Sequence, residues 1–268
     1  MADTGRSAVT RIPGFTAAAL LTFVLLYVPI ATLVVYSFNA APSMSRWDGF
    51  SLQWYEAALQ NRQVREVALR SLWLALAAGT MATLVATLAA LATVRGGRFR
   101  GRTMIHALIN QPLMVPEIVT GVALMVVFSV VRVRTGYDGM AYLVLAHTAF
   151  CIPFAYLPVR ARLETLDPTL AHAAADLYAS RVRAFLHVTL PLLWPGVLAG
   201  FMLAFVISLD AVVITEFVKS AGQDTLPTWM LGQLRRVVTP EMNAVATLLL
   251  GVSMLAVTAF FLLSRRRG

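Results

Sequence analysis

The sequence has little charge, one cysteine and one lysine, and each shortage excludes a class of protein. Charged residues are 13% of 268 positions, about half the share of a typical soluble domain. Cys151 alone allows neither an internal disulfide nor a thiolate metal cluster. Lys219 follows Val218 rather than a glycine, so the Gly-Lys-Ser phosphate loop of many ATPases is absent. The sequence also lacks a Gly-x-Ser-x-Gly elbow and a His-Glu-x-x-His zinc helix, and we therefore predict that the chain is not an enzyme.

Long apolar runs recur along the chain, and hydrophobic residues make up 59% of it. Each run is near the roughly 20 residues that a helix needs to cross a bilayer. The first is too long for the core of a signal peptide and has no small-residue cleavage signal, so we expect it to be retained. We predict an all-α membrane protein, one domain over residues 1–268, with six spans at 15–38, 72–94, 105–131, 140–159, 192–214 and 244–263.

The net charge of +9 is spread over the loops and carries no DNA- or RNA-binding motif. We therefore expect membrane lipid and no nucleic acid around the chain. Short loops rich in arginine stay in the cytoplasm, and this rule predicts that both termini are cytoplasmic. The arginines that carry the prediction are Arg6, Arg11, Arg95, Arg98, Arg100, Arg102, Arg160, Arg162, Arg181, Arg183 and Arg265 to Arg267. The opposite loops also contain arginines, among them Arg70, Arg132, Arg235 and Arg236, so the asymmetry is partial.

The segment 168–190, between the fourth and fifth spans, is the longest cytoplasmic stretch. Asp167-Pro168 predicts a helix start, with the aspartate as N-cap and the proline in the first turn. Four apolar residues then share one face of a short helix, with polar residues off that face. The apolar face consists of Leu170, Ala173, Ala174 and Leu177. An ordinary interfacial helix explains this pattern as well as a docking helix does.

A longer motif in this segment distinguishes the two. It consists of His172-Ala173-Ala174, three residues, Tyr178, nine residues, and Val188-Thr189-Leu190-Pro191. It resembles the EAA loop of binding-protein-dependent ABC importer permeases: Glu-Ala-Ala, three residues, Gly, nine residues, Ile-x-Leu-Pro. Further similarity, closest to the PotC type of spermidine/putrescine permease, lies in Ser37-Phe38-Asn39, Trp47, Gly49-Phe50, Trp54-Tyr55, Arg98 to Gly101, Pro116 to Val119, His147 to Phe154, Ser208 to Asp210 and Pro240 to Ala244.

The resemblance implies a type I ABC importer permease (MetI-like) fold with a cytoplasmic coupling helix. Such a chain forms half of a translocation pathway in a bacterial cytoplasmic membrane, for polyamines or a related small organic solute. The implied partners are a homologous permease in a heterodimer, two ATPase subunits that bind ATP and Mg, and an extracytoplasmic solute-binding protein; this chain holds no cofactor. The implied ATPase-coupling residues are Leu170, His172, Ala173, Ala174, Asp176, Leu177, Tyr178, Ser180, Arg181 and Arg183.

Two residues depart from the family pattern. His172 stands where the pattern has glutamate, and Tyr178 where it has glycine, the residue that takes positive φ without strain. Either the helix continues past Tyr178, or the partner's groove receives an aromatic ring.

Three acids lie in or near the spans: Asp210, Glu117 and Glu216. A carboxylate in a bilayer helix costs about 3 kcal/mol on insertion scales, so each needs a partner or a watery cavity. Asp210 fits a pathway for a cation or a structural ion pair. Glu117 follows a proline, and either lines a broken helix or satisfies backbone groups freed at a kink. Glu216 is expected at the outer water boundary.

Two other functions stay open at this point. An ion-gradient-driven secondary transporter or channel would use Asp210 and Glu117 as proton or cation sites. A structural scaffold would conduct no solute. His106 and His147 have no metal-ligand spacing, and we expect them to be hydrogen-bonded packing residues.

Overall fold

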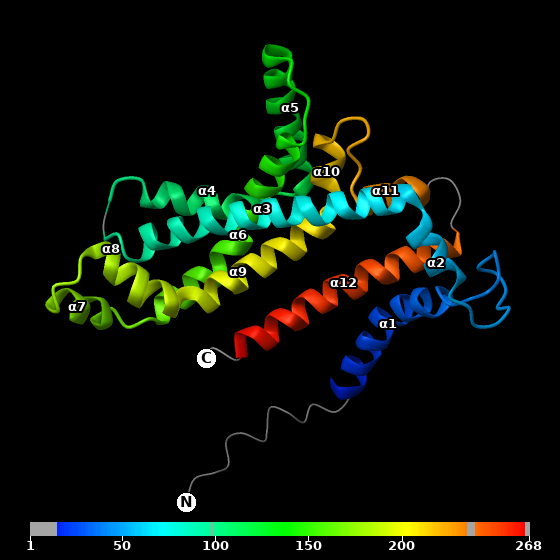
Figure 1. Ribbon diagram of the computed structural model, residues 1–268, viewed down its shortest axis with the longest axis horizontal. Helices are drawn as coiled ribbons and strands as arrows, with labels where there is room; N and C mark the ends of the chain where they lie inside the picture. Colours follow the sequence, from blue (N-terminus) through cyan, green and yellow to red (C-terminus); the bar gives the residue numbers. More distant parts are fainter. Residues whose placement is uncertain (1–14, 98, 235–238, 266–268) are drawn as a thin grey trace, which may run out of the picture. The chain divides into compact units, whose positions relative to one another are not determined.

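The computed structural model describes residues 15–97, 99–234 and 239–265 (Figure 1). These ranges contain helices, one isolated β-bridge between Asn39 and Phe50, and no strand. Six helices within these ranges are long and apolar enough to cross a membrane, which confirms the all-α class and the number of spans. The helices are α1 (Phe15–Tyr36), α2 (Gln53–Gln60), α3 (Arg62–Val94), α4 (Arg102–Met114), α5 (Glu117–Thr135), α6 (Ala141–Thr165), α7 (Thr169–Asp176), α8 (Arg181–Ala184), the π-helix η1 (Phe185–Thr189), α9 (Leu190–Asp210), α10 (Val213–Val218), α11 (Leu226–Leu234) and α12 (Pro240–Arg265).

Some residues used in the sequence predictions lie outside the described ranges. They are Arg6, Arg11, Arg98, Arg235, Arg236, Arg266 and Arg267, and the side chains of His172 and Arg265 are also undescribed.

The predicted span 105–131 is wrong as a single helix. The chain breaks at Val115-Pro116, and only α5 counts as a candidate span (Figure 1). Pro116 has no N–H to donate, and its ring disfavours helical geometry in the preceding residue. Val115 is extended accordingly, with φ −97° and ψ 135°. Pro112, by contrast, lies inside α4 without ending it.

The predicted span 192–214 also has different bounds. The candidate span runs as a nearly continuous helix from Arg181 to Asp210, through α8, η1 and α9. Ala211 leaves helical geometry at ψ 104°, and α10 then begins at Val213. Glu216 therefore lies on a separate short helix rather than in the span.

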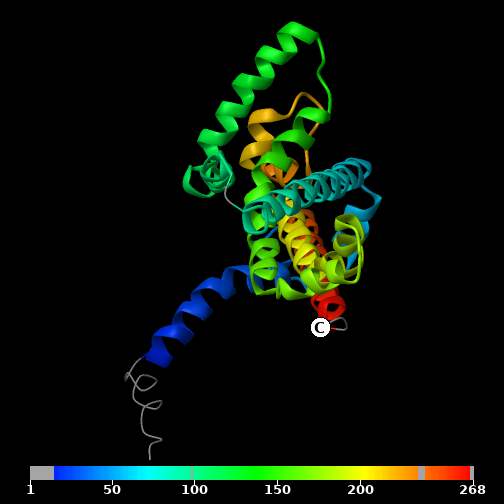
Figure 2. The ribbon, with the colours of Figure 1, turned by 90° about the vertical axis from the view of Figure 1, so that its left-hand side faces the viewer.

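The chain divides into two compact units, which we describe separately; that it is one domain stays a prediction. The larger unit comprises residues 62–236 and 251–268. Its centre is the packing of α3, α6 and α9, which lie side by side (Figures 1 and 2). Small residues make this close packing possible: a Cβ added at Gly200 of α9 would lie 2.6 Å from the carbonyl oxygen of Ala155 in α6.

The smaller unit comprises residues 1–61 and 237–250. Its loop after α1 is organised by buried Asn39, whose Nδ2 donates to Arg46 O (2.6 Å) and whose Oδ1 accepts from the Asp48 N–H (3.0 Å). Trp54 Nε1 donates to Asn39 O (2.7 Å), and the Ser37 and Tyr55 hydroxyls lie 2.5 Å apart. Hydrogen bonds therefore connect two motifs that resemble the family, Ser37-Phe38-Asn39 and Trp54-Tyr55, within this loop.

Candidate functional site

Two of the three predicted acids lie where the spans break. Asp210 is the exposed last residue of α9, and no residue in the described ranges gives it a hydrogen bond or ion pair. Glu117 begins α5, and its Oε1 accepts a long hydrogen bond (3.4 Å) from the Ile214 N–H in the first turn of α10. The two breaks are therefore linked through Glu117.

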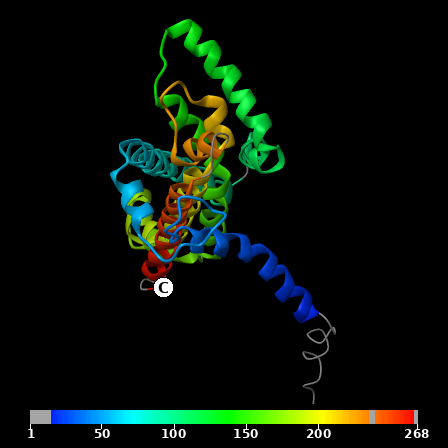
Figure 3. The same ribbon diagram turned by 90° about the vertical axis from the view of Figure 1, so that its right-hand side faces the viewer.

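Helices α5 and α10 lie against each other in the large unit (Figure 3). A Cβ added at Gly121 of α5 would lie 2.9 Å from Phe217 Cδ2 of α10, so a larger residue would force the Phe217 ring to move. Glu117 thus has a structural role at the N-terminus of α10, where a carboxylate is favoured by the helix dipole. Its contact with substrate stays a prediction, as does that of Asp210.

His147 connects the two sides of the break between α9 and α10. Its ring, fully buried on α6, lies 2.9 Å from the Ser208 hydroxyl (Nδ1) and 3.0 Å from the Thr215 hydroxyl (Nε2). The Thr215 hydroxyl donates its hydrogen to Ala211 O (2.7 Å). It must therefore accept from Nε2–H, which leaves Nδ1 to accept from Ser208. The prediction of a hydrogen-bonded packing histidine is confirmed, and the ring joins three helices.

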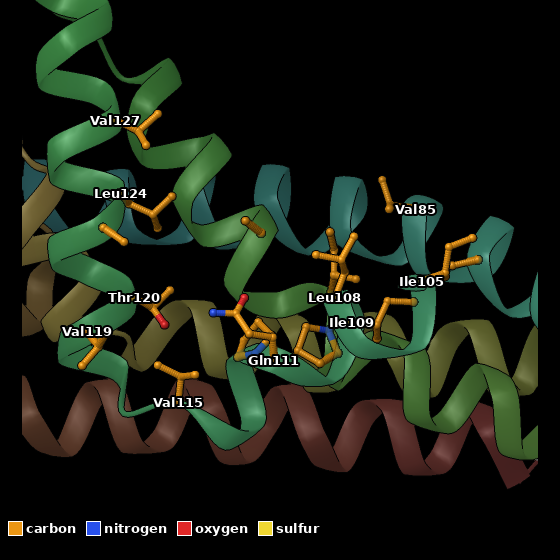
Figure 4. A pocket seen from close by; sticks show the side chains of 16 residues that line it. Val85, Ile105, Leu108, Ile109, Gln111, Val115, Val119, Thr120, Leu124 and Val127 are labelled. Carbon is orange, nitrogen blue, oxygen red and sulfur yellow. The ribbon is translucent and has the colours of Figure 1, made fainter. Parts of the chain in front are cut away.

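An apolar cavity of about 640 Å³ lies beside the break between α4 and α5. Its walls come from α3 to α6, and Figure 4 shows Gln111 and Thr120 among side chains that are otherwise apolar. The buried Thr120 Oγ1 has no hydrogen-bond partner in the described ranges. This cavity was not predicted from the sequence; Pro116, where the helix breaks, was its only signal.

The segment 168–190 begins as predicted and then turns. The Thr169 N–H donates to Asp167 Oδ1 (2.9 Å), and this bond holds the pKa of the Asp167 carboxyl below its usual value. Helix α7 ends at Asp176, so the alternative that it continues past Tyr178 is wrong. Tyr178 takes the left-handed conformation (φ 58°) that the glycine of the pattern would adopt.

The turn after α7 is a Schellman motif, with the two backbone bonds that define it. The Ala179 N–H donates to Ala174 O (3.0 Å), and the Tyr178 N–H donates to Ala175 O (2.9 Å). Ser180 then accepts from the Arg183 N–H and caps α8, which continues through η1 into α9. A helix therefore runs from Arg181 in this segment through α8, η1 and α9 to Asp210, the last residue of α9.

The coupling residues predicted from the resemblance lie mostly at the surface of the described chain. The side chains of Leu170, Leu177 and Tyr178 are exposed, and so are those of Ala173, Asp176, Ser180, Arg181 and Arg183; Ala174 is half-buried. Much of the apolar face of α7 is therefore exposed in the part of the chain that the structure describes, although Leu170 lines a cavity together with Phe185 and Val188 of η1.

Glu216 belongs to an ion cluster at the other end of α9 from this segment. Lys219 Nζ lies 2.5 Å from Glu216 Oε1 and 2.7 Å from Asp224 Oδ1, beside a polar pocket of about 280 Å³. Burial lowers the pKa of Lys219, but its hydrogen bonds to Asp224 and Glu216 outweigh this, so that the pKa lies above the usual lysine value. Asp224 was not predicted from the sequence, because no motif distinguishes it.

Two arginines that weakened the predicted charge asymmetry have local partners near this cluster. Arg70 donates to Asp224 O (2.7 Å), and Arg132 lies 3.1 Å from Asp138 and donates to the Ser220 hydroxyl (2.8 Å). The Ser220 hydroxyl in turn donates to Asp138. Arg70 lies on α3 and Arg132 on α5, so their side chains connect these helices to neighbouring loops.

Comparison with known proteins gives consistent results. The family model described as "Binding-protein-dependent transport system inner membrane component" matches residues 82–267. The chain is 37% identical over 261 residues to the putrescine transport system permease protein PotI of Escherichia coli K12, covering 96% of this chain and 93% of that protein. It is 37% identical over 243 residues to the spermidine/putrescine permease PotC of Haemophilus influenzae, covering 91% of this chain and 93% of that protein.

Solved structures show the same fold at low identity. A bacterial ABC transporter for the acidic polysaccharide alginate matches with a TM-score of 0.68 and 16% identity, covering 94% of this chain and 95% of that chain. The MetNI methionine ABC transporter matches with a TM-score of 0.60 and 19% identity, covering 78% of this chain and 100% of that chain.

Proposed function

Because the chain belongs to the family of binding-protein-dependent transport system inner membrane components, we propose that it is a permease subunit of an ATP-driven importer of putrescine or spermidine. The observation that carries the proposal is the similarity to polyamine permeases over nearly the whole chain, spans and loops alike. The chain is a multi-pass membrane protein of the MetI-like permease fold.

The proposed assembly contains a homologous permease, two ATPase subunits that carry ATP and Mg, and an external solute-binding protein. Both termini and the segment 168–190 face the cytoplasm in this assembly. ATP binding would favour one arrangement of the spans over the other through contacts at that face. The helical connection from the segment through α8 and η1 into α9 supports this role, since a helix transmits displacement along its axis.

The proposed pathway contact is Asp210. Its carboxylate ends α9 without a partner in the described ranges, and a carboxylate offsets the desolvation of a passing ammonium group. Glu117 is the second candidate, although its hydrogen bond to Ile214 gives it a structural duty as well.

Uptake of labelled putrescine and spermidine tests the proposal. Cells that lack this chain should lose uptake, and restoring the chain should recover it. Asp210→Asn should restore little transport, whereas Asp48→Asn, the same change at an exposed aspartate paired with Arg46, should restore most of it. Unchanged uptake in the deletion strain would reject the polyamine substrate.

The energy source separates the importer from its rival. In vesicles whose ATPase face is outside and whose lumen holds the solute and its binding protein, transport to the medium should require ATP and should survive ionophores that collapse ion gradients. Uptake that follows the ion gradient and ignores ATP would identify a secondary transporter instead, and no flux under either condition would indicate a scaffold.

A further inference from the structure

Tyr178 has a backbone conformation that its side chain disfavours. Among the described residues it is the one non-glycine with positive φ (58°). The other positive-φ positions are all glycines: Gly49, Gly97, Gly101, Gly136 and Gly222. A Cβ in this left-handed region lies too close to the following carbonyl oxygen, so a tyrosine here strains a turn that glycine would form freely.

No contact within the described chain compensates for this strain. The Tyr178 side chain is 97% exposed, the highest value among the exposed large hydrophobic residues. Its ring contacts no other aromatic ring, and its hydroxyl has no hydrogen-bond partner in the described ranges. Residues with a strained backbone conformation are concentrated at functional sites such as active sites and ligand-binding sites.

The surroundings of the ring indicate the chemistry of that partner. Leu177 (82% exposed) and Val182 (67% exposed) flank Tyr178 with apolar surface. Arg181 and Arg183, both exposed and three and five residues further along the chain, add two positive charges against the one negative charge of exposed Asp176. An apolar centre with a basic rim is complementary to an apolar pocket edged by carboxylates, and tyrosine and arginine are the residues most often found at the energetic centre of such interfaces.

The rigidity of the turn favours a protein over a lipid surface. The two backbone bonds of the Schellman motif and the Ser180 cap hold the backbone on both sides of Tyr178. A bilayer adapts to any arrangement of apolar and basic side chains, so it gains nothing from a strained turn. A preformed pocket gains from a ring that is already aimed, because less conformational freedom is lost on binding.

We propose that Tyr178 is an anchor: its ring enters an apolar, acid-rimmed pocket on the ATPase subunit of the same transporter, and the left-handed turn is retained because it aims the ring outward. This inference rests on the proposed function. It also explains why tyrosine can replace the glycine of the family pattern while α7 keeps its end at Asp176.

Three substitutions in the complete transporter separate the ring from the turn. Tyr178→Gly and Tyr178→Asn keep a residue that accepts positive φ but remove the ring, and Tyr178→Phe keeps the ring. The permease is purified in detergent through a tag, and the ATPase subunit that remains bound is quantified over a dilution series. We expect the Gly and Asn variants to weaken retention roughly tenfold or more, as at an interface hot spot, and the Phe variant to stay within about threefold of wild type.

The thermal stability of the permease distinguishes an anchor from a folding defect. Tyr178→Gly relieves strain, so its unfolding temperature should equal or exceed that of wild type while ATPase retention falls. Equal retention in all four proteins, with unchanged uptake, would overturn the proposal. So would Tyr178-dependent binding to anionic lipid vesicles without any change in ATPase retention. Failure of wild type itself to retain an ATPase would instead reject the proposed function.

Discussion

Thr215→Val tests whether His147 holds the broken helix together. Valine has nearly the shape of threonine, so the substitution removes the hydroxyl without opening a large cavity. The hydroxyl accepts from His147 Nε2–H (3.0 Å) and donates to Ala211 O (2.7 Å). Because the ring is fully buried, its N–H then has no partner and no access to water.

The expected loss follows from that orphaned donor. An unsatisfied buried donor costs about 1–3 kcal/mol, while hydrogen bonds between helices in membranes average about 0.6 kcal/mol in double-mutant cycles. We expect Thr215→Val to destabilise the protein by about 2 kcal/mol. His147→Leu removes the orphaned donor, so the double variant should be about 1–2 kcal/mol more stable than the sum of the single losses predicts.

The assay is equilibrium unfolding of the purified transporter in mixed micelles with increasing SDS. Thr215→Ser keeps the hydroxyl and serves as the matched control. Its stability should differ from that of wild type only through the loss of the threonine methyl group. A cost of Thr215→Val below about 0.5 kcal/mol, or strictly additive losses in the double variant, would refute the hydrogen-bond arrangement deduced for His147.

Two further predictions concern packing and charge. Gly200→Ala places a Cβ 2.6 Å from Ala155 O and should prevent α6 and α9 from packing, seen as loss of monodisperse protein in detergent; Gly251→Ala, where nothing lies within 4 Å, should leave the yield unchanged. Lys219 has a raised pKa, so its stabilising ion pairs are complete below the usual lysine value of 10.5 and are lost as the pH rises through the higher pKa of the folded state. Proteolysis of residues 219–225 should therefore stay constant from neutral to mildly alkaline pH and increase only at higher pH, whereas Lys219→Met should make this loop sensitive at pH 7.

Periodicity and hydropathy were sufficient for the number of spans and the helical class, because a bilayer requires each crossing segment to satisfy its own backbone hydrogen bonds. The same reasoning located the start of α7 from Asp167, since an N-cap acts within one turn. It failed inside the predicted third span, where Pro112 and Pro116 look alike in sequence and the helix breaks only at Pro116. Whether a proline kinks or breaks a helix depends on what packs around it.

The candidate site was also predicted from the sequence only in part. The spacing of the EAA-like motif puts Tyr178 where the family pattern has a glycine, but its left-handed conformation could not be predicted from a residue that avoids it. The bonds of His147 to Ser208 and Thr215 join residues more than sixty positions apart, and nothing local marks either hydroxyl as its partner.

The chain's own residues thus specify a six-span membrane protein and its family motifs, because hydrophobic length and local capping are properties of short segments. The partners of Glu117, His147 and Lys219, and the places where two spans break, were decided by tertiary packing. The partners depend on which residues, distant in sequence, lie close together in the low-dielectric interior. Each buried polar group needs a hydrogen-bond partner there, and the order of residues in the sequence does not identify it.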